Sequence, residues 1–155
     1  MFTKQVEGQN SVIMKFEVSN LEIPLFNLLA LIYEIELYTN WFPFCKQSRE
    51  LIHISKARKI ASCEFMLPVP FSNRGSVLYG CGVNRTKIDG SIVVVAKSLN
   101  LIPERTTLGV LNNPKYQKLL KPNLVNMICQ YYCCEILPVE KDRINMRAVF
   151  CVDPQ

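Results

Sequence analysis

Residues 64–75 read Glu-Phe-Met-Leu-Pro-Val-Pro-Phe-Ser-Asn-Arg-Gly, and two strand-like runs follow them, at residues 76–84 and 91–99. Pro68 and Pro70 have no backbone N–H to donate to a sheet, so they end one strand and turn the chain before the next begins. Arg74 therefore lies at the start of a strand, where its guanidinium can meet an anionic group while the aliphatic part of its side chain stays in apolar surroundings. The residues alone leave two interpretations open: a surface arginine paired with a carboxylate, or a cation that serves a binding site.

The composition indicates one folded domain over residues 1–155, a length sufficient for a hydrophobic core. Apolar residues make up 49% of the chain and charged residues 20%, a balance that excludes disorder. The apolar content is slightly high for this size. The surplus can enclose a ligand, cover a partner or fill the core, and composition does not choose among these.

The chain has seven cysteines, and residues 1–10 are polar, without the apolar segment of a secretory signal. We therefore expect a cytoplasmic protein with reduced thiols. No Cys-x-x-Cys pair occurs and His53 is the only histidine, so a zinc site would have to be assembled from scattered residues. We expect neither a metal nor a cofactor.

With a net charge of +5, the chain carries two basic clusters, one within residues 46–59 and the other at Lys115, Lys118 and Lys121. The aromatic residues are not interleaved with these cations, so we expect no nucleic-acid partner. A well-placed cation gains about 1 kcal/mol from anionic lipid headgroups. We therefore expect Lys115, Lys118 and Lys121 to make a peripheral contact with an anionic membrane. No apolar run is long enough to predict a transmembrane helix.

The periodicity of apolar residues predicts about seven strands and one long helix. Residues 12–18 alternate as a strand does, and a helical stripe then follows from Pro24 to Asn40. Three hairpins come next, pairing residues 50–55 with 60–66, 76–84 with 91–99 across Asp89 and Gly90, and 124–137 with 143–152. The last strand alternates throughout and directs Phe150 inward. The fold class is α+β, a curved antiparallel sheet with a helix across it.

The residues needed for catalysis do not gather in any recognisable pattern. His53 lies between Ile52 and Ile54 in a strand, without a serine or cysteine motif nearby. The acidic residues are scattered, and Gly80-Cys81-Gly82 does not precede a helix as a phosphate-binding loop does. We therefore predict that the protein is not an enzyme.

Three features in order resemble the START domain, the steroidogenic-acute-regulatory-related lipid-transfer family within the helix-grip superfamily. The segment from Pro68 to Arg74 resembles the Pro-x-Pro-x-Ser-x-Arg-Asp segment of phosphatidylcholine-transfer-like members. Trp41 resembles the tryptophan that precedes the first hairpin of the family, and Asp153 with Pro154 resembles its closing Asp-Pro pair. The resemblance covers residues 12–154.

This resemblance implies a sheet wrapped on a long helix, with a hydrophobic cavity that holds one lipid and carries it between membranes. Arg74 matches the motif arginine that faces the headgroup phosphate in phosphatidylcholine-binding relatives. A phospholipid is therefore favoured, and a sterol is the alternative ligand. The side chains expected to line the cavity with Arg74 are Ser76, Leu78, Gly80, Ile92, Val94, Ala96 and Phe150.

The sequence departs from the family pattern at three places. Gly75 stands where the family has an acidic residue, and Gly80 stands where it has a second inward arginine. The stretch from residue 99 to 124 is longer than in those relatives. The long C-terminal lid helix of the family is absent from this sequence, so we expect either a truncated form or an apolar groove that is open or covered by a partner or a second copy, as in a homodimer. The alternative function is accordingly a protein-interaction module that binds a partner's helix in this groove.

Overall fold

The computed structural model describes residues 2–5, 11–103, 114 and 125–153, and nine strands of this part form one sheet. The strands are β1 Phe2–Gln5, β2 Val12–Glu22, β3 Cys45–Ser55, β4 Arg58–Phe65, β5 Arg74–Arg85, β6 Ser91–Ser98, β7 Val125–Asn126, β8 Ile128–Glu140 and β9 Arg143–Asp153. The helical segments are α1 Leu25–Tyr33, the single-turn η1 Ile35–Leu37, α2 Tyr38–Trp41 and the single-turn η2 Leu99–Leu101.

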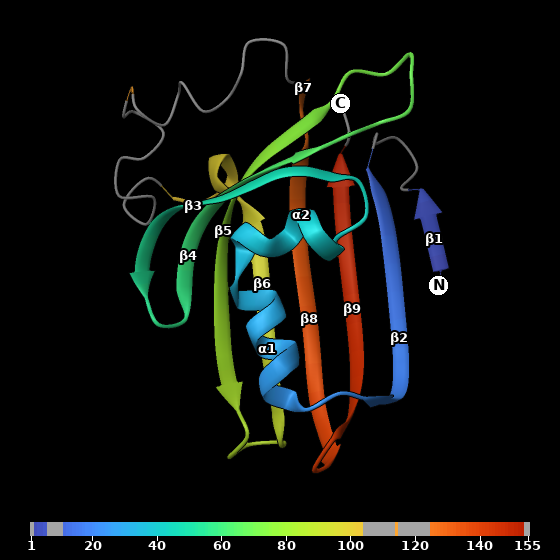
Figure 1. The fold of residues 1–155 in the computed structure, drawn as a ribbon, viewed down its shortest axis with the longest axis vertical. Helices are drawn as coiled ribbons and strands as arrows, with labels where there is room; N and C mark the ends of the chain where they lie inside the picture. The colour runs from blue at the N-terminus through green and yellow to red at the C-terminus, as the bar shows by residue number, and fades with distance from the viewer. Residues whose placement is uncertain (1, 6–10, 104–113, 115–124, 154–155) are drawn as a thin grey trace.

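Eight strands follow one another across the sheet in the order β1, β2, β9, β8, β6, β5, β4, β3, and each neighbouring pair is antiparallel. The short β7 pairs in parallel with the start of β5. The sheet is curved, and β3 and β4 curl across the front of β8 and β9 at one end of the molecule (Figure 1). The predicted α+β class, with a curved antiparallel sheet built from sequential hairpins, is confirmed.

The strands differ from the prediction mainly in number and at their ends. β1 was not predicted, because four residues with a single large apolar side chain carry no strand pattern. β3 begins five residues earlier than expected, at Cys45 rather than at Glu50. The turn between β5 and β6 is confirmed, and Gly90 adopts a φ of 79° there, which favours glycine.

The prediction of one continuous helix up to Asn40 is wrong, because the helix is interrupted at Glu34. Glu34 has φ −84° and ψ 73°, outside the helical region. Side chains take over the carbonyl groups that another helical turn would use: the Tyr38 hydroxyl donates to the Ile32 carbonyl over 2.6 Å, and Lys59 Nζ donates to the Tyr33 carbonyl over 3.1 Å. A helix whose last carbonyls are satisfied in this way ends there.

α1 packs its apolar stripe against the centre of the sheet. The partly buried Leu25, Leu28, Leu29 and Ile32 contact a buried cluster on β8 and β9, as the predicted stripe required; the cluster consists of Cys134, Ile136, Ile144 and Ala148. A second cluster, around the fully buried Ile60 and Leu99, includes Val77 and Tyr79 of β5, which point to the other face of the sheet. The sheet is therefore apolar on both of its faces.

Candidate functional site

The predicted inward residues of β5 and β6 do share the face of the sheet that α1 covers. Gly80 lies opposite Ala96 and Gly82 opposite Val94 in the ladder between these strands. Val94 contacts the α1 cluster, so this row identifies the helix-facing side, which we call the concave face. The same ladders place the remaining predicted residues on it, namely Ser76, Leu78, Ile92 and Phe150.

The concave face is bare where β5 passes Gly80 and Gly82. A Cβ atom added at Gly80 would meet nothing closer than the Lys59 carbonyl oxygen at 4.0 Å, and one at Gly82 nothing closer than Ala57 at 3.9 Å. Neither glycine has a positive φ, so the backbone does not require glycine at these positions. The missing side chains leave room against the sheet, next to the small side chain of Ala96.

Beyond this bare strip, the concave face continues as a neutral surface of aromatic rings and thiols. Tyr132 lies opposite Ala96 and meets the ring of Phe150 edge to face, with 6.2 Å between the ring centroids. Burial raises the pKa of the Tyr132 phenol above its ordinary value, and it raises the pKa of the Cys63 thiol to about 12. These groups stay uncharged at neutral pH and favour an apolar occupant.

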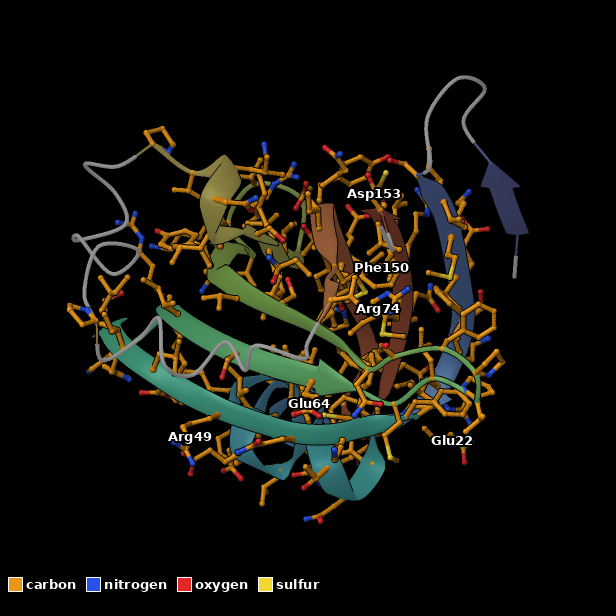
Figure 2. The ribbon with its side chains drawn as sticks, turned by 90° about the horizontal axis from the view of Figure 1, so that it is seen from above. Glu22, Arg49, Glu64, Arg74, Phe150 and Asp153 are labelled. Carbon is orange, nitrogen blue, oxygen red and sulfur yellow. The ribbon has the colours of Figure 1, made fainter. Side chains whose placement is uncertain are left out.

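Arg74 begins β5, as predicted, with its Cα opposite Phe65 of β4 and beside Val125 of β7. Its Nη1 donates to the Ser72 carbonyl over 2.7 Å. The ring of Phe65 packs against that of Phe42 at 5.8 Å, so the arginine lies at the edge of an aromatic cluster. Seen from above, Arg74 and Phe150 lie inside the curve of the sheet, whereas Arg49 lies outside it (Figure 2).

The Ser76 hydroxyl forms a hydrogen bond within the protein. Its buried hydroxyl lies 3.1 Å from the Ser98 hydroxyl, and Ser98 Oγ accepts the backbone N–H of Cys129 over 2.8 Å. The pair joins β5, β6 and β8 near the end of the sheet where Arg74 lies. Ser76 therefore stabilises the frame around the site, in addition to lying on the concave face.

Glu64 is a residue of this region that the sequence analysis missed. Its side chain is buried, with 7% of the residue exposed, and its Oε1 accepts from Lys46 Nζ over 3.0 Å and from Asn73 Nδ2 over 2.9 Å. In the ladder it lies opposite Gly75. An acidic residue within the predicted strand 60–66 was the only signal for it.

An exposed apolar loop adjoins Arg74, formed by residues 66–73 between β4 and β5. It contains no charged residue, and Val69 is 94% exposed and Phe71 63% exposed. Phe44, 69% exposed, lies beside it, because the Met66 N–H donates to the Phe44 carbonyl over 2.8 Å. This surface was not predicted as a site. The predicted membrane-contact residues Lys115, Lys118 and Lys121 lie outside the described residues.

No three or more His, Cys, Asp or Glu side chains in the described ranges gather as a metal ion would require. No helix within the part of the chain that the structure describes has the length and hydropathy to cross a bilayer.

The sequence matches no protein-family model and no curated protein. Among solved structures, the chain has the helix-grip fold of START domains. It superposes on the human StarD13 (DLC2) lipid transfer and protein localization domain with a TM-score of 0.71, at 14% identity and over 99% of this chain and 68% of that one. It also resembles human STARD10, with a TM-score of 0.69 at 12% identity over 99% of this chain and 56% of that one.

A bacterial structure shows the same likeness: a STAR-related lipid transfer protein from Xanthomonas axonopodis superposes with a TM-score of 0.69 and 16% identity, over 96% of this chain and 72% of that one. The chain therefore spans from 56% to 72% of the length of these three structures. The sequence-based assignment to the START, helix-grip fold is confirmed.

Proposed function

We propose that this domain binds one lipid against the concave face of its sheet and carries it between membranes, or senses it, without a chemical step. The observation that carries the proposal is the bare strip at Gly80 and Gly82, which leaves space on the concave face beside the Lys59–Glu50 ion pair. A shared fold supports it, since the START structures described above are named as lipid-transfer proteins. Burial of an acyl chain or ring system there gains about 25 cal/mol per Å² of apolar surface.

Arg74 is the headgroup anchor in this proposal, which favours a phospholipid over a sterol. It stands at the end of the strand that carries Gly80, inside the curve of the sheet. A guanidinium offers two parallel N–H donors to the oxygens of a phosphate, and such contacts strengthen where water is excluded. The acyl chains would extend from there past Leu78, Gly80 and Ala96, with Ile92, Val94 and Phe150 completing the wall.

The apolar loop is the part of the described surface best suited to touch a bilayer. Exposed apolar side chains at one end of a molecule, here Val69, Phe71 and Phe44, enter the boundary between headgroups and acyl chains. Lys46 lies exposed near the same end and favours anionic lipid. The contact through Lys115, Lys118 and Lys121 stays a prediction, and the loop contact is independent of it.

The test fills the bare strip with a side chain. Gly80→Phe places a ring on the concave face at a position where an added Cβ would meet nothing closer than 4.0 Å, so the ring should take the place of the lipid. We expect transfer of fluorescent phosphatidylcholine between vesicles to fall at least tenfold, with an unchanged melting temperature. The matched control is Val83→Phe, on the opposite face of the same strand, which should transfer at the wild-type rate.

Two results would count against the proposal. If Gly80→Phe folds and transfers lipid as fast as the wild type, the concave face does not hold the lipid. If Val83→Phe and Gly80→Phe lose transfer equally, the loss reports general damage to β5, and the strip at Gly80 has no special role.

A protein-interaction module is the second candidate function, and two exposed residues on the same face favour it. Phe16 and Val18 lie opposite Ala148 and Met146 on the concave side of β2, yet they are 36% and 39% exposed. A partner's amphipathic helix, or a second copy of the chain, could cover them. Light scattering during size exclusion separates the candidates: a stable dimer without bound lipid supports this one, and a lipid-loaded monomer supports the carrier.

A further inference from the structure

The apolar loop is fastened to the sheet at both of its ends. At the start of the loop, the Met66 N–H donates to the Phe44 carbonyl over 2.8 Å. At its end, Asn73 Nδ2 donates to Glu64 Oε1 over 2.9 Å, and the Asn73 carbonyl accepts from the Val125 N–H over 3.3 Å. The Phe71 N–H donates to the Pro68 carbonyl over 3.0 Å, a bond inside the loop that does not tie it to the sheet.

Of these contacts, the one to Glu64 involves a buried charge. Glu64 is 7% exposed, and the oxygen that accepts from Asn73 also accepts from Lys46 Nζ over 3.0 Å. A buried carboxylate depends on its hydrogen-bond donors, and bonds to a charged acceptor are stronger than neutral ones. The tip of the loop, with Val69 almost fully exposed, gains little from packing. The position of the loop is therefore set at its ends, and at Asn73 by the side-chain bond to Glu64 together with the backbone bond from Val125.

The same end of the loop also contacts the side chain of Arg74. Asn73 and Arg74 are neighbours in the chain, and the carbonyl of Ser72, on the other side of Asn73, accepts from Arg74 Nη1 over 2.7 Å. A loop that moves away from Glu64 takes the Ser72 carbonyl with it. The guanidinium then loses its hydrogen bond to that carbonyl.

We infer that Glu64 is a positioning residue of the proposed lipid site. Through Asn73, it holds the apolar loop closed and keeps Arg74 at the mouth, so breaking this hydrogen bond is a step of lipid entry and exit. The effect on lipid rests on the proposed function, whereas the fastening of the loop does not. The loop should therefore open in the lipid-free protein whenever this bond is removed.

Hydrogen exchange of the Met66 and Phe71 amides follows the opening of the loop without lipid, at its attachment to Phe44 and at its inner turn. In Asn73→Ala, which changes no residue of the apolar wall, we expect both amides to exchange at least tenfold faster than in the wild type. Asn84→Ala is the matched control: Asn84 Oδ1 accepts from the Thr86 N–H at the opposite end of β5, so exchange at Met66 and Phe71 should not change. Unchanged exchange in Asn73→Ala would overturn the inference.

A double-mutant cycle separates the specific bond from a general loss of stability. Glu64→Ala should speed the exchange of the two amides as Asn73→Ala does, and the double variant should be no faster than either single one. Glu64→Gln keeps an acceptor oxygen for Asn73 and should retain most of the protection. If Glu64→Ala does not fold, Glu64→Gln and Asn73→Ala still decide the question, and additive effects across the cycle would contradict the inference.

Lipid transfer is the second arm of the test. In Asn73→Ala, the rate of phosphatidylcholine exchange between vesicles should rise at least threefold, while the bound fraction at equilibrium changes less. Faster amide exchange with unchanged transfer would overturn the role of Glu64 at the site. A wild-type protein that binds no lipid would contradict the proposed function and the lipid part of this inference together, whereas amide exchange would still decide whether Glu64 fastens the loop.

Discussion

At the scale of single residues, the position of Arg74 could be predicted from the sequence, whereas the burial of Glu64 could not. Arg74 stands after two prolines at the start of a strand, and its position at the end of the sheet was predicted from that pattern. Glu64 was not identified, because its burial depends on Lys46, 18 residues earlier, and on Asn73, nine residues later. Local sequence patterns carry no information about such contacts.

The role of Arg74 predicts a selective loss of affinity. Arg74→Ala should weaken binding of a phospholipid about tenfold or more, because a charge-assisted bidentate contact is lost. Binding of a neutral sterol should change less than twofold, since it makes no such contact. Arg74→Lys should be intermediate, because an ammonium group cannot form the paired contact. Titration with fluorescent analogues of both lipids measures the difference.

The matched control for this prediction is Arg49→Ala, which removes an exposed arginine outside the curve of the sheet. It should bind both lipids as the wild type does. Equal losses of phospholipid and sterol affinity in Arg74→Ala would remove the anchor role and leave Arg74 a structural residue.

At the scale of elements, the interruption of the helix at Glu34 explains why α1 ends where it does. The apolar stripe of α1 was predicted from its periodicity and is confirmed by the contacts of Leu25, Leu28, Leu29 and Ile32. The end of α1 was not predictable, because the side chain that takes the Tyr33 carbonyl comes from Lys59 on β4. Lys59 Nζ also lies 3.4 Å from the centroid of the Tyr33 ring, which ties α1 to the hairpin of β3 and β4.

This attachment of α1 to the sheet predicts a dependence of stability on pH. Glu50 Oε2 lies 2.6 Å from Lys59 Nζ, and Glu50 Oε1 lies 3.3 Å from His53 Nδ1. Hydrogen bonding to Lys59 lowers the pKa of Glu50 below its ordinary 4.5. Because the pKa is lower in the folded state, the stabilisation is complete above pH 4.5 and is lost as the pH falls through the folded value.

Glu50→Gln should accordingly unfold more easily than the wild type at pH 7, by about 1 kcal/mol. Urea denaturation at pH 7 and at pH 3 measures this difference, which should shrink at pH 3, because Glu50 of the unfolded chain binds a proton below pH 4.5. Glu17→Gln is the control, because Glu17 pairs with Lys15 and Arg147 on the exposed side of β2, and its effect should be smaller. A deficit that is the same at both pH values would contradict the ionic role of Glu50.

The apolar loop predicts where the domain meets a membrane. Val69→Ser with Phe71→Ser should lower binding to vesicles of phosphatidylcholine and phosphatidylserine roughly tenfold, because two apolar side chains no longer enter the bilayer. The free energy of unfolding should not change, since both residues are largely exposed. Co-sedimentation with the vesicles measures the effect.

Ile88→Ser provides the control for the loop, because Ile88 is also largely exposed but lies in the turn between β5 and β6, at the other end of these strands. It should bind vesicles as the wild type does. If Ile88→Ser weakens binding as much as the loop variant, the contact is a general effect of hydrophobicity and has no defined place on the surface.

At the scale of the whole molecule, the curved sheet places a largely apolar face inside its curve, with Lys59 beside Gly80 and with Arg74 and an apolar loop at one end (Figure 2). The three hairpins and the inward faces of β5, β6 and β9 were predictable, because turn residues mark a hairpin and alternation identifies the buried face of a strand. β1 and the division of the helix were not, because they depend on contacts between distant parts of the chain. The curved sheet thus forms the wall of the proposed site, and the small residues at positions 80, 82 and 96 leave space against that wall.

The most direct test of the central claim is native mass spectrometry of freshly purified protein, followed by extraction and identification of what it carries. The account predicts one phospholipid for each chain, lost or strongly reduced in Gly80→Phe and retained in Val83→Phe. A spectrum with only the mass of the empty protein, together with no transfer of phosphatidylcholine or sterol between vesicles, would contradict it.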